Sequence, residues 1–492
     1  MRQRAVLADP GRAGRCAGDD VASPPSYWGN VTSCQEELSQ EELSQEELGL
    51  GALRAEYTAR RLSPRDVVEL VLARVDRRGD DAVWISRHGA ELLRRRADEL
   101  QLAAGRRGGD LSAWPLYGVP CAIKDNIDVA GLPTTAGCPG YAYQPAQSAA
   151  CVRRLVEAGA IVIGKTNMDQ FATGLTGTRS PYGVCRNVHG GDMIPGGSSS
   201  GSAVAVAAGL VSFALGTDTA GSGRVPAALN GIVGCKPTRG LVSTNGIVPA
   251  CRSLDCVSIF TAGVADAGTV LRVLAQPEPT DPWSRAAAPP RHLPARPVIA
   301  LPAADELDFD RDGGVQRAFD TMRERICASS EVVITSIEPL LEAGELLYRG
   351  PWVAERLAEL EAFFAQHPDE VLPVTRRVIE SGRRFDAVET FRAQHRLQEL
   401  RHWTEEQLWQ RADLLVLPTV PTTFTVDEIA QQPIERNSVL GRYTQFVNLL
   451  DLAAVAVPTG YTADGRPASV SVIGPAFSDA LLRTVGAELA HR

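Results

Sequence analysis

The stretch of sequence that decides the fold runs from Pro195 to Ala227. It begins with the loop P-G-G-S-S-S-G-S at 195–202 and ends with the turn D-T-A-G-S-G-R-V-P-A at 218–227. A Gly-rich loop that opens a helix can bind phosphate, but no Lys closes the first loop in the Walker A manner and no G-x-G-x-x-G occurs there. A nucleotide site is therefore disfavoured, and neither loop by itself identifies a function.

The regions around this stretch alternate between two kinds of segment. Between Leu116 and Val264, short apolar or β-branched runs are separated by Ala-rich helical stretches and Gly-rich turns. The runs are 119–123, 161–163, 211–215 and 232–235, and the helical stretches are 149–158 and 202–208. Strands that alternate with helices are typical of the α/β class. We therefore predict an α/β fold whose core motifs lie between 116 and 264.

The outer parts of the domain are predicted to be mainly helical. The apolar spacing from Leu48 to Leu102 fits two or three amphipathic helices, and Ser63-Pro64 has the residue types of an N-cap and a first helical position. A variable region at about 297–412 is expected to be mostly helical, with the helical pattern running from 315 to 412. The remaining predicted elements are strands at 414–417 and 470–473 and a last helix at 479–491.

Residues 1–47 differ in composition from the rest of the chain. From Gln35 to Leu48 the sequence repeats Q-E-E-L with a period of five residues. A period of five does not match the 3.6 residues of a helical turn, so the Leu residues would give no continuous apolar stripe. We expect a disordered or weakly ordered tail at 1–47 and a single domain at 48–492.

The overall composition excludes several classes of function. The 492 residues carry 50 Lys and Arg against 59 Asp and Glu, a formal net charge of −9, with no basic run. Nucleic acids and anionic membrane surfaces both require a basic face, so we exclude them as main partners. No apolar run has the length of a membrane span, and the first residues lack the apolar core of a secretory signal. The ten Cys and seven His show neither zinc spacing nor a disulfide framework. We expect a cytoplasmic protein without metal or cofactor.

One Lys stands out because of where it lies. Lys124 ends the apolar run of G-V-P-C-A-I-K-D at 118–125. A buried Lys favours its neutral form, which can act as a base. The alternative is a structural salt bridge to Asp125 or Asp128.

Together, the Lys and the two loops resemble the amidase signature family. In that family a buried Lys, a Ser in a cis peptide and a nucleophilic Ser form a Ser-Ser-Lys triad, and the order and spacing of Lys124, Ser198 and Ser222 match its three positions. The resemblance implies an α/β fold with a mixed central sheet covered by helices on both faces. It also implies that Ser222 is the nucleophile and that Lys124 accepts its proton through Ser198. A cis Gly197-Ser198 bond is expected.

The resemblance also suggests how a developing oxyanion is bound. The backbone N–H groups of Thr219, Ala220, Gly221 and Ser222 are expected to form the oxyanion hole, because small residues leave the approach open. The family usually has Gly at the position of Ala220, which is a small change.

Within the family, the sequence is most similar to the allophanate hydrolases. The matching stretches are 83–87, 168–183, 252–256, 348–356 and 443–451. The match places Tyr348 and Arg356 on the positions that bind the substrate carboxylate, and Gly174 in the substrate-side loop. Arg binds a planar carboxylate with two parallel hydrogen bonds. The alternative for Arg356 is an exposed helical residue paired with Glu355 or Glu359. Allophanate hydrolases commonly carry a C-terminal domain, and we expect this chain to represent the amidase domain alone.

The leading functional hypothesis is release of ammonia from a small carboxylate-bearing amide. The first alternative is an amidase-fold enzyme that acts on another small amide or transfers the acyl group to an amine. The second is a catalytically inactive scaffold subunit, which the complete set of Lys124, Ser198 and Ser222 disfavours. The expected partner is a small-molecule amide, and the resemblance allows a homodimer.

Overall fold

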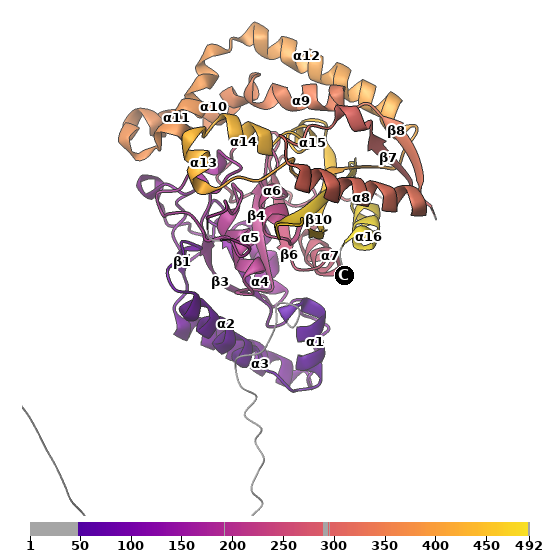
Figure 1. The fold of residues 1–492 in the computed structure, drawn as a ribbon. Coiled ribbons are helices and arrows are strands. Elements are labelled where there is room, and N and C mark those ends of the chain that lie inside the picture. Colours follow the sequence, from indigo (N-terminus) through magenta and orange to yellow (C-terminus); the bar gives the residue numbers. More distant parts are fainter. Residues whose placement is uncertain (1–47, 191, 289–293, 295, 491–492) are drawn as a thin grey trace, which may run out of the picture. The chain divides into compact units, whose positions relative to one another are not determined.

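The computed structural model describes residues 48–190, 192–288, 294 and 296–490 (Figure 1). All of them belong to one compact unit. The tail predicted at 1–47 lies outside the described residues. No helix of the described part is long and apolar enough to cross a membrane.

The described residues form an 11-stranded sheet in the order β1-β3-β2-β4-β6-β5-β10-β11-β9-β7-β8. The strands are β1 Trp84–Arg87, β2 Pro120–Lys124, β3 Ile161–Thr166, β4 Phe213–Asp218, β5 Val233–Lys236, β6 Cys256–Thr261, β7 Val298–Pro302, β8 Glu331–Thr335, β9 Leu414–Pro418, β10 Leu452–Tyr461 and β11 Pro467–Pro475. β2 pairs in parallel with β3 and β4, and β7 with β8 and β9, whereas the other pairs are antiparallel. The predicted mixed sheet is therefore confirmed.

Helices cover both faces of this sheet (Figure 1). The α-helices are α1 Leu50–Thr58, α2 Pro64–Arg78, α3 Ala90–Arg106, α4 Ala150–Glu157, α5 Ser200–Ala207, α6 Val225–Leu229, α7 Val264–Leu274, α8 Gly313–Ser329, α9 Glu338–Tyr348, α10 Trp352–Gln366, α11 Pro373–Glu380, α12 Ala387–Trp403, α13 Val426–Gln431, α14 Glu435–Leu440, α15 Phe446–Leu449 and α16 Asp479–Leu489. Short helical turns lie at Pro139–Tyr141, Gln170–Ala172, Ala304–Glu306, Pro368–Glu370, Ser381–Arg384 and Thr404–Trp409.

The two faces of the sheet carry separate cores. Helices α4, α7, α8 and α16 pack on one face, and α2, α3 and α5 pack on the other face at the β1–β6 end. β2 shows why: Cys121 and Ile123 enter the first core and Ala122 the second, because successive side chains of a strand point to opposite faces. At the other end of the sheet, α9, α12 and α15 pack in a third core.

Most of the predicted elements are present. The expected helices at the start of the domain are α1, α2 and α3, and Ser63 caps α2 in a capping box with Asp66. The prediction of helix across 315–412 is wrong at β8, where the run E-V-V-I-T pairs in parallel with β7. β-branched residues suit a pleated strand better than a helix. β1, β6, β7 and β10 were not predicted from the sequence.

Candidate active site

The predicted triad residues lie at one edge of the sheet. Lys124 is the last residue of β2, and the turn that carries Ser222 follows β4. Because β2 and β4 are parallel, their carboxyl ends meet at the same edge. Ser198 belongs to the loop that leads into α5, and α5 packs against both strands.

Lys124 is buried and bonded to neutral groups. Its Nζ lies 2.7 Å from Ser198 Oγ and 2.8 Å from Thr217 Oγ1, and the side chain is fully buried. The alternative of a salt bridge to Asp125 or Asp128 is wrong. Asp125 pairs with Lys165 at 3.3 Å, and Asp128 accepts hydrogen bonds from Thr134 and Tyr143. Burial lowers the pKa of Lys124 to about 7, against the raising effect of Asp169 and of other nearby carboxylates. Near neutral pH this amine is therefore available as a proton acceptor.

Ser198 is held by a crowded loop. The Gly197-Ser198 peptide bond is cis, as the resemblance led us to expect. A Cβ on Gly197 would lie 2.0 Å from Asp169 Oδ2, so only Gly fits there. The Asp169 N–H also donates to the Ser198 carbonyl at 3.0 Å. These contacts leave the Ser198 hydroxyl directed at Lys124.

Ser222 is buried in the turn after β4, but it is not hydrogen-bonded to Ser198. Among the described contacts, the Ser222 hydroxyl has no hydrogen-bond partner, and the residue is 3% exposed. Within the described residues, the structure thus joins Lys124 to Ser198 by a hydrogen bond and shows no such bond to Ser222. Catalytic hydrogen bonds are often long without substrate and shorten in the complex.

The backbone of the turn corrects one expected oxyanion donor. The Gly221 N–H donates to Asp218 Oδ1 at 2.9 Å, so it is already engaged. Within the described residues, the N–H groups of Thr219, Ala220 and Ser222 have no such partner, although all three residues are buried. The candidate donor set is therefore Thr219, Ala220 and Ser222.

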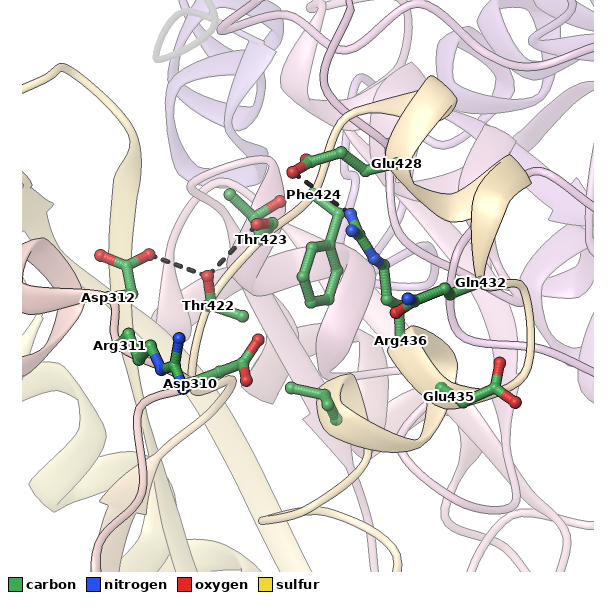
Figure 2. Close-up of a pocket in the computed structure, with 11 residues that line it drawn as sticks. Asp310, Arg311, Asp312, Thr422, Thr423, Phe424, Glu428, Gln432, Glu435 and Arg436 are labelled. Carbon is green, nitrogen blue, oxygen red and sulfur yellow. Dashed lines mark hydrogen bonds and ion pairs between the residues drawn. The ribbon is translucent and has the colours of Figure 1, made fainter.

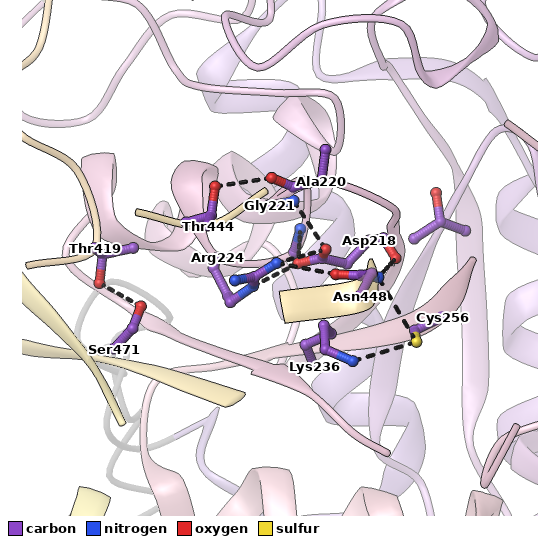
Figure 3. A network of polar contacts seen from close by, with 12 residues as sticks. Asp218, Ala220, Gly221, Arg224, Lys236, Cys256, Thr419, Thr444, Asn448 and Ser471 are labelled. Carbon is purple, nitrogen blue, oxygen red and sulfur yellow. Dashed lines mark hydrogen bonds and ion pairs between the residues drawn. The ribbon is translucent and has the colours of Figure 1, made fainter. Parts of the chain in front are cut away.

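A network of buried polar residues supports this turn (Figure 3). Arg224 binds Asp218 through two hydrogen bonds of 2.9 Å, and both side chains are fully buried. Burial alone would raise the pKa of Asp218, but Arg224 holds it below its usual value. Asn448 completes the network by donating to the Asp218 carbonyl at 2.7 Å. Analysis of the sequence missed these supporting roles, although D-x-x-x-x-x-R was visible in the turn.

Arg356 is a buried cation without an anionic partner. It is 1% exposed, and no carboxylate of the described residues lies within 4.0 Å of its nitrogens. Its Nη1 contacts Ala172 O at 3.4 Å and Thr173 Oγ1 at 3.2 Å, and its Nη2 contacts Tyr348 Oη at 3.4 Å. Burial lowers the pKa of Arg356, but Tyr348, Cys251 and nearby acidic groups raise it by more, so the pKa lies above its usual value and the guanidinium stays charged.

The predicted alternative for Arg356 is wrong, because both neighbouring carboxylates bind elsewhere. Glu355 accepts from the Ser253 N–H and the Ser253 hydroxyl, each at 2.7 Å. Glu359 forms a bidentate pair with Arg252 at 2.8 Å. The two Glu residues attach α10 to the loop before β6 and leave Arg356 pointing inward.

The substrate-side loop contacts Arg356 from the other side. Phe171 and Ala172 both have positive φ angles, 51° and 53°, and Phe171 packs among aromatic residues of α10. Non-Gly residues in this conformation often mark functional loops. Gly174 follows, and a Cβ there would lie 2.6 Å from Asp169 Oδ2. The structure therefore places Gly174 beside the same Asp169 that crowds the Ser198 loop.

A separate polar pocket of about 390 Å³ lies beside α13 and α14 (Figure 2). Glu428 lies 3.2 Å from Arg436, and Asp312 forms an ion pair with Arg466 at 2.6 Å and accepts from Thr422 at 2.9 Å. None of the predicted site residues lines it, so we assign it no catalytic role. Its lining residues are Asp310, Arg311, Asp312, Thr422, Thr423, Phe424, Glu428, Gln432, Glu435, Arg436 and Val439.

Across the described ranges, no group of three or more His, Cys, Asp or Glu side chains is arranged to hold a metal ion. Seven of the eight described Cys side chains are buried, and none of the eight forms a disulfide with another.

Comparison with known proteins assigns this architecture to a class. The fold and the relatives define an amidase, an enzyme that hydrolyses carbon–nitrogen bonds. The sequence model of the family named Amidase matches residues 66–482, and the chain belongs to that family. The predicted family, fold and enzyme class are confirmed.

Particular relatives narrow the comparison further. A solved allophanate hydrolase of Kluyveromyces lactis is 39% identical, with a TM-score of 0.83 over 89% of this chain and 72% of that one. The urea amidolyase of Lachancea kluyveri is 43% identical over 84% of this chain, which spans only 22% of that relative. One subunit of the glutamyl-tRNA(Gln) amidotransferase of Natronomonas pharaonis is 35% identical over 76% of this chain and 96% of its own length.

Proposed function

We propose that this chain hydrolyses a small amide that carries a carboxylate, of the allophanate type, and uses Lys124, Ser198 and Ser222 as its triad. The 2.7 Å contact between Lys124 and Ser198 supports the triad, as does the lowered pKa of Lys124. The similarity to the allophanate hydrolase of K. lactis supports the substrate class.

The proposed reaction proceeds through an acyl-enzyme. The Ser222 oxygen attacks the amide carbon, and its proton passes through the Ser198 hydroxyl to neutral Lys124. The free N–H groups of the turn bind the oxyanion. The C–N bond then breaks, and the nitrogen leaves as ammonia after it takes a proton back from Lys124. Water attacks the acyl group by the same proton route and regenerates Ser222.

The lack of a direct ion-pair partner for Arg356 among the described residues is the observation that carries the substrate assignment. A buried cation is costly unless an anion pairs with it. Here the neighbours that contact the guanidinium are a carbonyl, a hydroxyl and a phenol. A substrate carboxylate would supply a direct ion-pair partner and accept two hydrogen bonds from Arg356, with Tyr348 as a further donor.

An ammonia-release assay tests the proposal. Allophanate and malonamate carry a carboxylate, whereas biuret and simple aliphatic amides do not. We expect kcat/KM to be at least tenfold higher for one of the carboxylate-bearing substrates than for any neutral amide. Equal turnover of neutral amides would refute the substrate class, and no ammonia from any of them would refute the hydrolase.

A second candidate is an amidase-fold enzyme that transfers the acyl group of its substrate to an amine acceptor. The observation in its favour is the 35% identity along almost all of an amidotransferase subunit. Glutamine, which also carries a carboxylate, and hydroxylamine as an amine acceptor belong in the same assay. Hydroxamate formation faster than hydrolysis would favour acyl transfer.

The proposal also covers the boundaries of the domain in the sequence. We infer that 48–492 form one amidase domain, with core motifs at 116–264 and a variable region at about 297–412. The matched range 66–482 supports this assignment. The cytoplasmic location and the homodimer stay predictions.

A further inference from the structure

We infer that Thr444 is a positioning residue for the oxyanion turn, a role that rests on the proposed function and extends it to a side chain far away in the sequence. Thr444 is fully buried just before α15. Its Oγ1 donates to the Ala220 carbonyl at 2.8 Å, across 224 residues of sequence (Figure 3).

This bond fixes one peptide unit from both sides. The Ala220 carbonyl binds Thr444, and the N–H of the same peptide unit, from Gly221, donates to Asp218 Oδ1 at 2.9 Å. A rotation of this peptide plane would break both bonds. Because the plane is fixed, the free N–H groups of Ala220 and Ser222 on the adjacent planes keep their directions.

The packing at Gly221 shows how closely Thr444 approaches the turn. Gly221 has a φ of +131°, a region that side chains rarely adopt. A Cβ there would lie 2.3 Å from Thr444 Oγ1. Gly at 221 thus allows the turn its conformation and lets the Thr444 hydroxyl reach the backbone.

Asn448 extends the same support to the start of the turn. Its Nδ2 donates to the Asp218 carbonyl at 2.7 Å and to the Leu254 carbonyl at 3.0 Å, and its Oδ1 accepts from Arg224 at 3.2 Å. Thr444 and Asn448 are four residues apart, so one short segment holds two points of the turn. Preorganised donors aimed at a developing charge act mainly on the transition state. The role therefore predicts a loss in kcat, with substrate binding retained.

The test replaces the Thr444 hydroxyl by a methyl group of similar size. Removal of one direct oxyanion donor typically lowers kcat by about 10²–10³-fold. Since Thr444 acts through the backbone, we expect Thr444→Val to lower kcat by roughly 10- to 100-fold with KM within about twofold of the parent. Thr444→Ser, which keeps the hydroxyl, should recover kcat to within roughly threefold.

Thr419→Val is the matched control. Thr419 is also a fully buried Thr, and its hydroxyl lies 3.0 Å from Ser469 Oγ and 3.0 Å from Ser471 Oγ, neither of which belongs to the turn. It should lower the melting temperature much as Thr444→Val does and leave kcat unchanged. If Thr444→Val keeps kcat within twofold, or if its loss lies in KM alone, the positioning role is wrong.

Labelling by a fluorophosphonate gives a second measurement that needs no turnover. The reagent phosphonylates the nucleophilic Ser and places a P–O oxygen at the oxyanion site, so Thr444→Val should react more slowly than Thr419→Val. If Thr444→Val does not fold, the labelling rate of Thr444→Ser tests the hydroxyl contact instead. This rate should stay within threefold of the parent rate, and a larger drop would refute the contact. Ser222→Ala should not be labelled. Undiminished labelling of Ser222→Ala would refute the proposed triad itself, separately from Thr444.

Discussion

The pH dependence of turnover tests the role of Lys124 most directly. A base must be neutral to accept a proton, and burial lowers the pKa of this amine to about 7. Roughly one molecule in eleven would then be neutral at pH 6 and roughly ten in eleven at pH 8. We expect kcat/KM to rise about tenfold between pH 6 and pH 8 and to reach a plateau above it.

Malonamate is a suitable substrate for this measurement, because its carboxylate stays ionised across the range. An unperturbed Lys would give a different profile: with the ordinary pKa of 10.5, kcat/KM would rise about 100-fold between pH 6 and pH 8 and continue to rise at pH 9. Lys124→Arg should be inactive throughout, because a guanidinium stays protonated. A flat profile, or an active Arg variant, would refute the base role.

The lowered pKa of Lys124 also affects the stability of the folded chain, and this effect can be measured without an activity assay. The folded chain holds Lys124 neutral between about pH 7 and 10.5, where the unfolded chain keeps it protonated, so folding is favoured as the pH rises. The free energy of unfolding of the parent, measured against Lys124→Met, should increase by about 1.4 kcal/mol per pH unit between pH 8 and 10. Urea denaturation at the two pH values checks this, and an unchanged difference between the two proteins would contradict it.

Three further predictions concern the nucleophile, the carboxylate site and the helix that carries it. Ser222→Ala should reduce ammonia release to background with an unchanged melting temperature; ordinary turnover would mean that another group is the nucleophile. Arg356→Ala should lose about 2–4 kcal/mol in kcat/KM on malonamate and nothing on a neutral amide, whereas equal losses on both would assign Arg356 to the fold. Glu355→Gln weakens the partly buried attachment of α10 to Ser253 and should raise KM for malonamate. Glu359→Gln breaks only an exposed ion pair and should leave KM unchanged; the same KM in both variants would contradict a role of Glu355 in placing Arg356.

The sequence by itself determined the features that depend on local chemistry. The alternation of apolar runs and helical stretches indicated the α/β class, and the Gly/Ser loops with Lys124 indicated the family. These signals are readable because strand and helix periodicity, and the need for Gly in a crowded loop, belong to short segments. The prediction of helix at β8 was wrong because this segment pairs with β7 in the folded sheet. Such tertiary pairing outweighs the local pattern of the segment.

The tertiary structure alone decided which groups are free and which are engaged. The resemblance placed Arg356 at a carboxylate-binding position, with an exposed helical residue paired with Glu355 or Glu359 as the alternative, and only the packing shows that both Glu side chains bind the loop before β6. Likewise, the engagement of the Gly221 N–H and the contact of Thr444 with the turn could not be seen in the sequence. The physical reason is sequence separation: Arg356 contacts a loop 184 residues away, and Thr444 a carbonyl 224 residues away. Such contacts form only when the chain folds, and no local pattern records them.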